Sequence, residues 1–180
     1  MIIKLDVSKL DSRTVERIAC QTDDISVLTQ LAMSDNADIV INVIENPETT
    51  KEIRDAICDK WVNKEQNRQV MEVLVECPLS ADGIHKIVEQ MSCKSPWVCK
   101  VLVLQEEISA EDLQRIFDNV TGGDLAKSFV MDVLSNMTSN NNMSESLMQK
   151  LVDYSPEIAS KIAKRYSRFL RVEFYKGQTE

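Results

Sequence analysis

Glycine and proline are scarce in this chain of 180 residues, which contains four of each. Folds with many strands and tight turns depend on both residue types, so the shortage disfavours long β-meanders. Few segments alternate strictly between apolar and polar residues, and the apolar residues instead recur at intervals of three and four. That period is typical of amphipathic helices. The sequence therefore predicts an all-α protein.

Histidine is scarcer still, because His85 is the only one in the chain. Nucleophilic catalysis needs a base beside the nucleophile, and no Ser or Cys lies at a spacing from His85 that suggests such a relay. We interpret His85 as a surface or packing residue. The pair Gly122-Gly123 lacks the Gly-Lys-Ser/Thr sequence of a phosphate-binding loop and predicts a turn. We expect no enzymatic activity and no cofactor.

The sequence also lacks a recognisable set of metal ligands. Its five cysteines have irregular spacings and form no CxxC pair. Cys93 and Cys99 flank a short segment, but zinc would need two more ligands at a compatible spacing. We therefore predict no metal site, and we expect free, mostly buried thiols in a reducing compartment.

Long apolar runs are missing. The opening residues, MIIKLD, do not contain the apolar run of a signal peptide. No stretch approaches the roughly 18 apolar residues of a membrane-spanning helix. We expect a cytoplasmic protein with no membrane span.

Basic residues are outnumbered, and the formal net charge is −8. Residues 1–90 hold 10 basic and 17 acidic side chains, whereas residues 91–180 hold 11 and 12. Phosphate contacts need clustered Lys and Arg, so this balance argues against broad nucleic-acid binding. The acidic half of the chain comes first.

A unit of two helices recurs along the chain, and a hydroxyl residue marks each predicted start. Ser and Thr accept hydrogen bonds from the free N–H groups of a helix's first turn. Ser12 is predicted to cap a half unit before the first repeat, and Thr49 with Glu52 fits a capping box. The polar stretch 135–146 is predicted to be an extended loop. The five predicted starts are Thr22, Thr50, Ser80, Ser109 and Ser144, at spacings of 28, 30, 29 and 35.

The second helices of the five predicted units align more closely with one another than the first helices do. Their apolar residues fall at three equivalent positions, which we call the three apolar columns. One unit is too small to bury such a stripe alone, so neighbouring units must stack to form a continuous core. The columns are Val43, Val73, Val101, Val133 and Ile162, then Ile44, Leu74, Leu102, Leu134 and Ala163, and one turn earlier Val40, Val70, Val98, Val130 and Ala159.

The first full unit, with Leu31-Ala32, Asp35, Ile39, Val43-Ile44 and Asn46-Pro47-Glu48-Thr49, resembles the leucine-rich repeat variant family and, more broadly, HEAT-like α-solenoids. Later units lose the Asn-Pro pair. The resemblance implies a right-handed α-solenoid (α-α superhelix) of about five stacked helix pairs, in a single domain over residues 1–180. We expect an N-terminal cap over residues 1–21, repeats over 22–155, and a C-terminal capping helix and tail over 156–180.

Solenoids present extended concave surfaces to partners, so we predict a non-enzymatic scaffold that binds a protein or peptide. In HEAT-like proteins the second helices line the concave side. Val75, Val103 and Leu104 either form the apolar centre of this interface or widen the buried stripe. The predicted partner-binding residues are Asn42, Asn46, Glu72, Glu76, Lys100, Asp132, Asn136, Lys161 and Arg165.

The alternative is a nucleic-acid-binding HEAT-like protein related to DNA alkylation repair. Its support is the basic amphipathic segment that contains Lys161, Lys164 and Arg165. The same segment is equally explained as a terminal helix whose charged outer face keeps a solenoid end soluble. The acidic N-terminal half argues against the nucleic-acid alternative.

Overall fold

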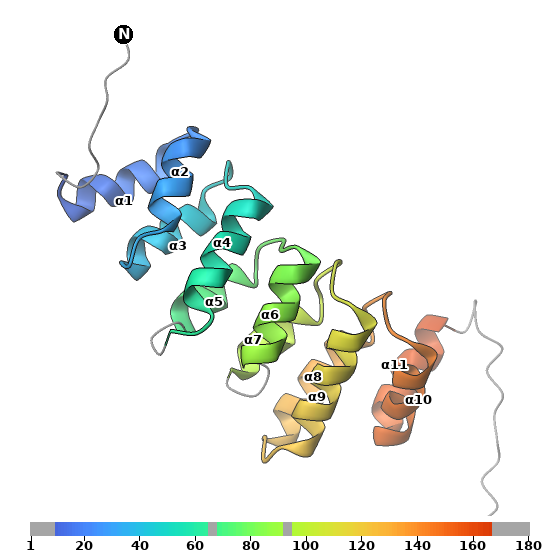
Figure 1. The fold of residues 1–180 in the computed structure, drawn as a ribbon. Coiled ribbons are helices and arrows are strands. Elements are labelled where there is room, and N and C mark those ends of the chain that lie inside the picture. The colour runs from blue at the N-terminus through green and yellow to red at the C-terminus, as the bar shows by residue number, and fades with distance from the viewer. Residues whose placement is uncertain (1–9, 65–67, 92–94, 167–180) are drawn as a thin grey trace, which may run out of the picture.

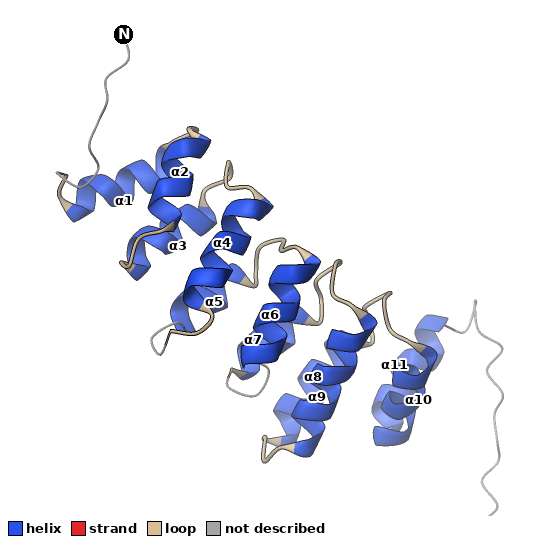
Figure 2. Cartoon of the chain, viewed as in Figure 1, coloured by secondary structure: helices blue, strands red, loops and turns tan. Residues whose placement is uncertain are grey.

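The protein is described by a computed structural model over residues 10–64, 68–91 and 95–166. These ranges contain eleven helices and no strand (Figure 2), so the prediction of an all-α protein is confirmed for them. Residues 1–9 of the predicted N-terminal cap (1–21) and residues 167–180 of the predicted C-terminal capping helix and tail (156–180) lie outside the described residues. The helices are α1 (Ser12–Gln21), α2 (Ile25–Ala32), α3 (Ala37–Glu45), α4 (Lys51–Trp61), α5 (Arg68–Leu74), α6 (Ala81–Met91), α7 (Pro96–Leu102), α8 (Ala110–Gly122), α9 (Lys127–Met137), α10 (Glu145–Tyr154) and α11 (Pro156–Tyr166).

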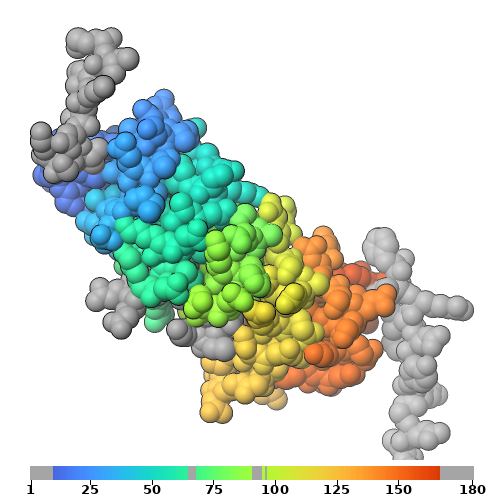
Figure 3. All heavy atoms as spheres, viewed as in Figure 1, coloured from blue at the N-terminus to red at the C-terminus, as the bar shows by residue number. Residues whose placement is uncertain are grey.

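The helices alternate between two layers. In the odd layer, α1, α3, α5, α7, α9 and α11 each pack against the next member. In the even layer, α2, α4, α6 and α8 do the same, and α10 packs against α11. The pairs follow one another in a row from the blue end to the red end (Figure 1), and the space-filling view has the same elongated outline (Figure 3). Residues about one unit apart in sequence therefore become neighbours in space.

The core lies between the two layers, and the three predicted columns point into it. Every residue of the columns is buried or half-buried, and Val40, Ile44 and Leu102 are fully inaccessible. The apolar period of the sequence therefore identified the core side of the odd-layer helices correctly.

Four of the predicted helix starts are confirmed by side-chain caps. The hydroxyl of Thr50 accepts a hydrogen bond from the N–H of Ile53 at 3.5 Å, and that of Ser109 from Asp112 at 3.0 Å. The Ser80 and Ser144 hydroxyls accept from the third residue beyond them, each at 3.1 Å. Short polar side chains at these positions satisfy backbone donors that have no partner within the helix.

The predicted start at Thr22 is wrong. The carboxylate of Asp24 caps α2 instead, accepting from the N–H groups of Ser26 at 2.8 Å and Val27 at 3.3 Å. Thr22 ends α1, because its backbone N–H still donates to Ile18. The sequence offers two good caps within three residues, and the carboxylate is the one that reaches the free donors of α2.

Two neighbouring assignments also change. Asp11, not Ser12, caps α1 through a 3.0 Å hydrogen bond from the N–H of Thr14. Thr49 does not take part in a capping box, because its side chain is buried and its hydroxyl donates to the carbonyl of Val43 at 2.5 Å.

The polar stretch 135–146 is not an extended loop. Helix α9 continues through it to Met137, and α10 begins at Glu145. Between them, Asn140 donates to the carbonyls of Val103 and Gln105, each at 3.0 Å. Asn142 Nδ2 donates to the backbone carbonyl of Glu106 at 2.7 Å and to that of Ile108 at 2.9 Å. The asparagines that make the stretch look loop-like are thus the groups that fasten it to the preceding unit.

The same kind of contact recurs along the odd layer, and we call it the carbonyl ladder. The side chain of a residue just beyond one odd-layer helix donates to backbone carbonyls at the end of the previous odd-layer helix. Carbonyls at a helix end have no hydrogen-bond partners within their own helix. Asn46 donates to Ala19 at 2.8 Å and Thr22 at 3.0 Å, and Gln105 donates to Val75 at 2.6 Å and Cys77 at 3.0 Å. With Asn140 above, these rungs join α3 to α1, α7 to α5 and α9 to α7.

Candidate functional site

Five of the predicted partner-binding residues lie on the outer side of the odd layer. Each precedes a residue of the first buried column, and each is half-buried or exposed: Asn42, Glu72, Lys100, Asp132 and Lys161. The structure brings two of them together across α7 and α9, where Lys100 Nζ lies 2.9 Å from Asp132 Oδ2. Lys161 Nζ donates to the hydroxyl of Ser135 at 2.5 Å.

The N-terminal members of this set have local partners. Asn42 Nδ2 donates to the carbonyl of Asp38 in its own helix at 2.8 Å. Glu72 Oε1 accepts from Arg68 Nε, also at 2.8 Å. Along this surface, Glu72 contributes acidic charge towards the N-terminal end and Lys161 basic charge towards the C-terminal end, and the Lys100–Asp132 ion pair lies between them.

Three predicted residues hold the fold together and do not offer a free side chain. Asn46 is only 2% exposed and forms a rung of the carbonyl ladder. Asn136 Nδ2 donates to the carbonyl of Lys100 at 3.0 Å. The guanidinium of Arg165 donates to the Thr138 carbonyl at 2.6 Å and to Asn141 Oδ1 at 2.8 Å. The burial of Asn46 corrects its assignment to the partner-binding set, whereas Asn136 and Arg165 are half-buried and their role at a partner surface stays a prediction.

The outer side of α7 is the most apolar part of this surface, and we call it the outer stripe. Trp97 is 45% exposed and Leu104, just past the helix, is 50% exposed, while Lys100 and Val101 are half-buried between them. The opposite side of the helix is buried. The sequence interpretation missed Trp97. It precedes Lys100, Val101 and Leu104 by three, four and seven residues, and these intervals place all four side chains on one side of α7.

Burial decides whether Val75, Val103 and Leu104 belong to an interface or widen the buried stripe. Val75 and Val103 are fully buried, so they widen the core. Leu104 alone remains on the surface. An exposed leucine by itself is ordinary, but one on the same face as an exposed tryptophan is a feature of interaction sites.

A hollow of about 430 Å³ opens at the C-terminal end of the outer stripe, and we call it the α5–α7 hollow. One side is closed by an ion pair between Lys51 and Glu107. The apolar and acidic residues come from the turn after α5, from the last turn of α7 and from the turn that follows α7. The lining residues are Lys51, Val75, Glu76, Pro78, Leu79, Val101, Leu104, Gln105, Glu106 and Glu107.

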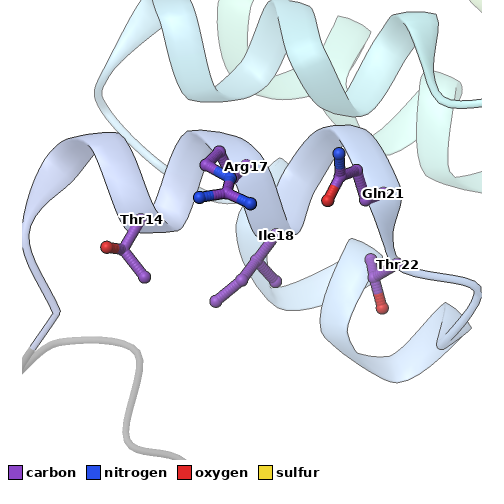
Figure 4. Close-up of a pocket in the computed structure, with 5 residues that line it drawn as sticks. All are labelled: Thr14, Arg17, Ile18, Gln21 and Thr22. Atoms are coloured by element: carbon purple, nitrogen blue, oxygen red, sulfur yellow. The ribbon is translucent and has the colours of Figure 1, made fainter.

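A second hollow of similar size, about 430 Å³, follows α1 at the N-terminal end of the row. Figure 4 shows the side chains of Thr14, Ile18 and Thr22 along one side of the helix, with Arg17 and Gln21 beside them. Its lining comes from α1 and the residue that ends it. Its lining includes one arginine and one partly buried isoleucine. It therefore has fewer apolar and fewer charged side chains than the lining of the α5–α7 hollow.

The outer side of the even layer is different, because its charges are paired from helix to helix. Lys86 lies 2.6 Å from Asp59, Arg115 lies 2.9 Å from Glu89, and Lys150 lies 3.6 Å from Asp118. Each pair joins consecutive even-layer helices. Exposed pairs of this kind contribute little to stability, but they leave less uncompensated charge for a partner.

His85 lies in this layer within a small polar cluster. Its Nδ1 is 2.8 Å from Oδ1 of the buried Asp112, whose other oxygen accepts from the hydroxyl of Ser109 at 2.7 Å. Asp112 therefore stands between the imidazole and the hydroxyl. A Ser–His–Asp relay needs the imidazole in the middle, so this geometry does not activate Ser109. Sequence reasoning could not see the cluster, because α6 and α8 meet only when the units stack.

The hydrogen bond that the imidazole makes to the Asp112 carboxylate raises the pKa of His85 above its ordinary value. The charges of Asp112 and Glu89 act in the same direction, and Arg115 opposes them. Since the pKa is higher in the folded state, protonation stabilises the fold. This contribution is complete below about pH 6.5, the ordinary histidine value, and is lost as the pH rises through the folded-state pKa.

We expect the proton NMR signal of the imidazole to titrate above pH 6.5, the ordinary histidine value. Assignment is direct because the chain has one histidine. Asp112→Asn should bring the midpoint down, while Asp118→Asn, on the same helix but not a contact of His85, should leave it in place. A wild-type midpoint at or below the ordinary value would contradict the geometry.

Four cysteines lie in the described ranges, where all are free thiols, and Cys93 lies outside them. Burial raises the pKa of the Cys58 thiol to about 12, and its Sγ donates to the carbonyl of Gly83 at 3.6 Å. Gly83 permits this close packing of α6 on α4, since a Cβ there would lie 2.5 Å from Asp55 Oδ1. Cys20 is exposed.

Among the side chains that the structure places, no group of three or more His, Cys, Asp or Glu residues could hold a metal ion. None of the helices in the described ranges is long and apolar enough to cross a bilayer. Comparison of the chain with protein-family models, curated proteins and solved structures gave no match. The function must therefore be argued from the surface itself.

Proposed function

We propose that this protein is a non-enzymatic scaffold that binds a partner protein along the outer side of its odd layer. In this proposal the helices form a right-handed α-solenoid of about five stacked pairs, and the odd layer lines its concave side. A single domain over residues 1–180 and a cytoplasmic location remain predictions that accompany it.

The outer stripe of α7 is the observation that carries the proposal. Trp97 and Leu104 expose large apolar side chains on one helical face near the middle of the row. Glu72 and Asp132, on the neighbouring helices, supply charged groups around them. A large apolar or aromatic centre within a polar rim is the usual anatomy of a protein interface, and truncation of such anchors has the largest effects on affinity.

The nucleic-acid alternative has less support. Arg165 is held by the Thr138 carbonyl and Asn141, and Lys161 is bonded to Ser135. The same side of the row carries Glu72 and Asp132, which repel phosphate. A strand of nucleic acid that ran along the row would have to pass both carboxylates.

The test is a comparison of two double variants as baits in a cell lysate, followed by quantitative mass spectrometry. Trp97→Ala with Leu104→Ala should reduce the recovery of specific partners at least about tenfold, because both anchors are lost. Gln114→Ala with Gln149→Ala, two polar changes on the even layer, should leave recovery unchanged. Equal recovery by the two baits, or loss only in the even-layer variant, would place the interaction elsewhere.

A further inference from the structure

The α5–α7 hollow has apolar walls. Val75 and Leu79 are buried at its base, Val101 is half-buried, and Leu104 stands exposed at its mouth. A volume of about 430 Å³ is enough for one large apolar side chain of a partner. Covering Leu104 and the neighbouring carbons would remove apolar surface from water, which favours an apolar occupant.

The rim of the hollow is acidic and uncompensated. Glu76 and Glu106 are exposed, and neither forms an ion pair within the part of the chain that the structure describes. The cation at this rim, Lys51, is already paired with Glu107. On the even layer, by contrast, Asp59, Glu89 and Asp118 each have a basic partner. The two carboxylates beside the hollow thus favour a cationic neighbour.

Neither property is sufficient alone. An exposed carboxylate that pairs with Lys or Arg contributes little binding energy, so charge by itself would not hold a partner in place. An apolar hollow by itself would accept any apolar group. Together they select a segment that carries both features, and the carboxylates exclude anionic ligands such as phosphate or an anionic lipid headgroup through like-charge repulsion.

We propose that the α5–α7 hollow receives a large apolar side chain from a partner protein, with Lys or Arg on both sides of that residue paired to Glu76 and Glu106. This inference rests on the proposed function, since it names the partner chemistry at one end of the outer stripe. The basic residues guide encounter and orientation, and the apolar residue supplies the anchor.

The experiment uses the full-length protein labelled with nitrogen-15 and a nine-residue peptide with a central phenylalanine, two basic residues on each side and a Gly-Ser frame. NMR titration should shift the backbone amides of residues 75–77, 79 and 101–107 in a saturable way. The same peptide with serine at its centre should not saturate these shifts. Absence of localised shifts, or equal binding of the serine peptide, would overturn the proposal.

A pair of protein variants tests the charges. Glu76→Gln with Glu106→Gln should raise the Kd of the phenylalanine peptide at least about fivefold, the effect of two lost ion pairs. Asp124→Asn with Glu145→Gln changes the net charge equally at exposed positions outside the lining of the hollow, and should leave the Kd within twofold. Circular dichroism confirms that both variants fold. Equal Kd values in the two variants would refute the pairing.

The peptide experiment and the lysate experiment fail in different ways. If the peptide does not bind in the hollow while Trp97→Ala with Leu104→Ala still abolishes partner recovery, the outer stripe remains a binding surface and the partner chemistry named here is wrong. If recovery is also unaffected, the proposed function itself is wrong.

Discussion

Replacing Leu102 with alanine should lower the free energy of unfolding by about 2–5 kcal/mol, the range for truncation of a buried leucine. Leu102 is completely inaccessible and lies in α7, which packs against α5 and α9 in the odd layer and against α6 in the even layer. Because three helices pack against α7, we expect the site to collapse only if one of them moves. The residual cavity therefore adds to the lost transfer free energy.

Leu104→Ala is the matched control, since the same side chain is removed two residues further on. Leu104 is 50% exposed, so its truncation should cost less than about 1 kcal/mol. Urea unfolding followed by circular dichroism measures both variants under the same conditions. A loss well under 1 kcal/mol for Leu102→Ala, or similar losses for the two variants, would show that the buried column has been assigned to the wrong side of α7.

Replacing Asn140 with alanine should cost at least about 2 kcal/mol, because backbone groups are left buried without partners. Asn140 is 6% exposed, and its Nδ2 donates to the carbonyls of Val103 and Gln105. Its Oδ1 accepts from the N–H of Asn142 at 2.8 Å. Asn140 itself is buried although its neighbours in the turn are exposed, so water replaces the lost hydrogen bonds only in part.

Ser139→Ala is the control for this second variant. Ser139 is the exposed neighbour of Asn140 and forms no rung of the carbonyl ladder. We expect its substitution to change the unfolding free energy by less than about 0.5 kcal/mol. If Asn140→Ala were equally harmless in a urea titration, the turn between α9 and α10 would be held by something other than the ladder.

The ladder changes how the polar residues of this chain are understood. Asn46, Gln105 and Asn140 occupy corresponding places after α3, α7 and α9, and all three donate to the end of the preceding odd-layer helix. Cys77 holds the corresponding place after α5, where its Sγ donates to the carbonyl of Ile44 at 3.8 Å. A thiol is a weaker donor than an amide. The contact between α3 and α5 therefore has the weakest rung.

The candidate surface was only partly predictable from helical spacing. Asn42, Glu72 and Lys100 lie within helices, where an outward position follows from the buried column beside them. Asn46 lies past the end of α3, so the helical angle no longer applies and its side chain turns inward. The rule failed at this position because it was extended beyond the last helical residue.

Local chemistry determined most of what the sequence could say by itself. The intervals of three and four place Ile44, Leu74 and Leu102 on one side of their helices, since side chains so spaced share a helical face. The hydroxyls of Thr50, Ser109 and Ser144 mark helix starts because a cap needs only the next three residues. Both signals act within one helix, so no knowledge of the neighbouring units is required.

Tertiary structure alone decided the contacts between units. Asp112 and His85 are 27 residues apart, and Asn140 and Val103 are 37 apart. Their pairing depends on how far each helix is shifted along its neighbour, and no local pattern specifies that shift. The α5–α7 hollow has the same origin, since its walls come from the turn after α5, from α7 with the turn after it, and from Lys51 of α4. The sequence by itself determined the helices and their buried sides. Stacking decided which polar groups form hydrogen bonds between units and which remain on the surface.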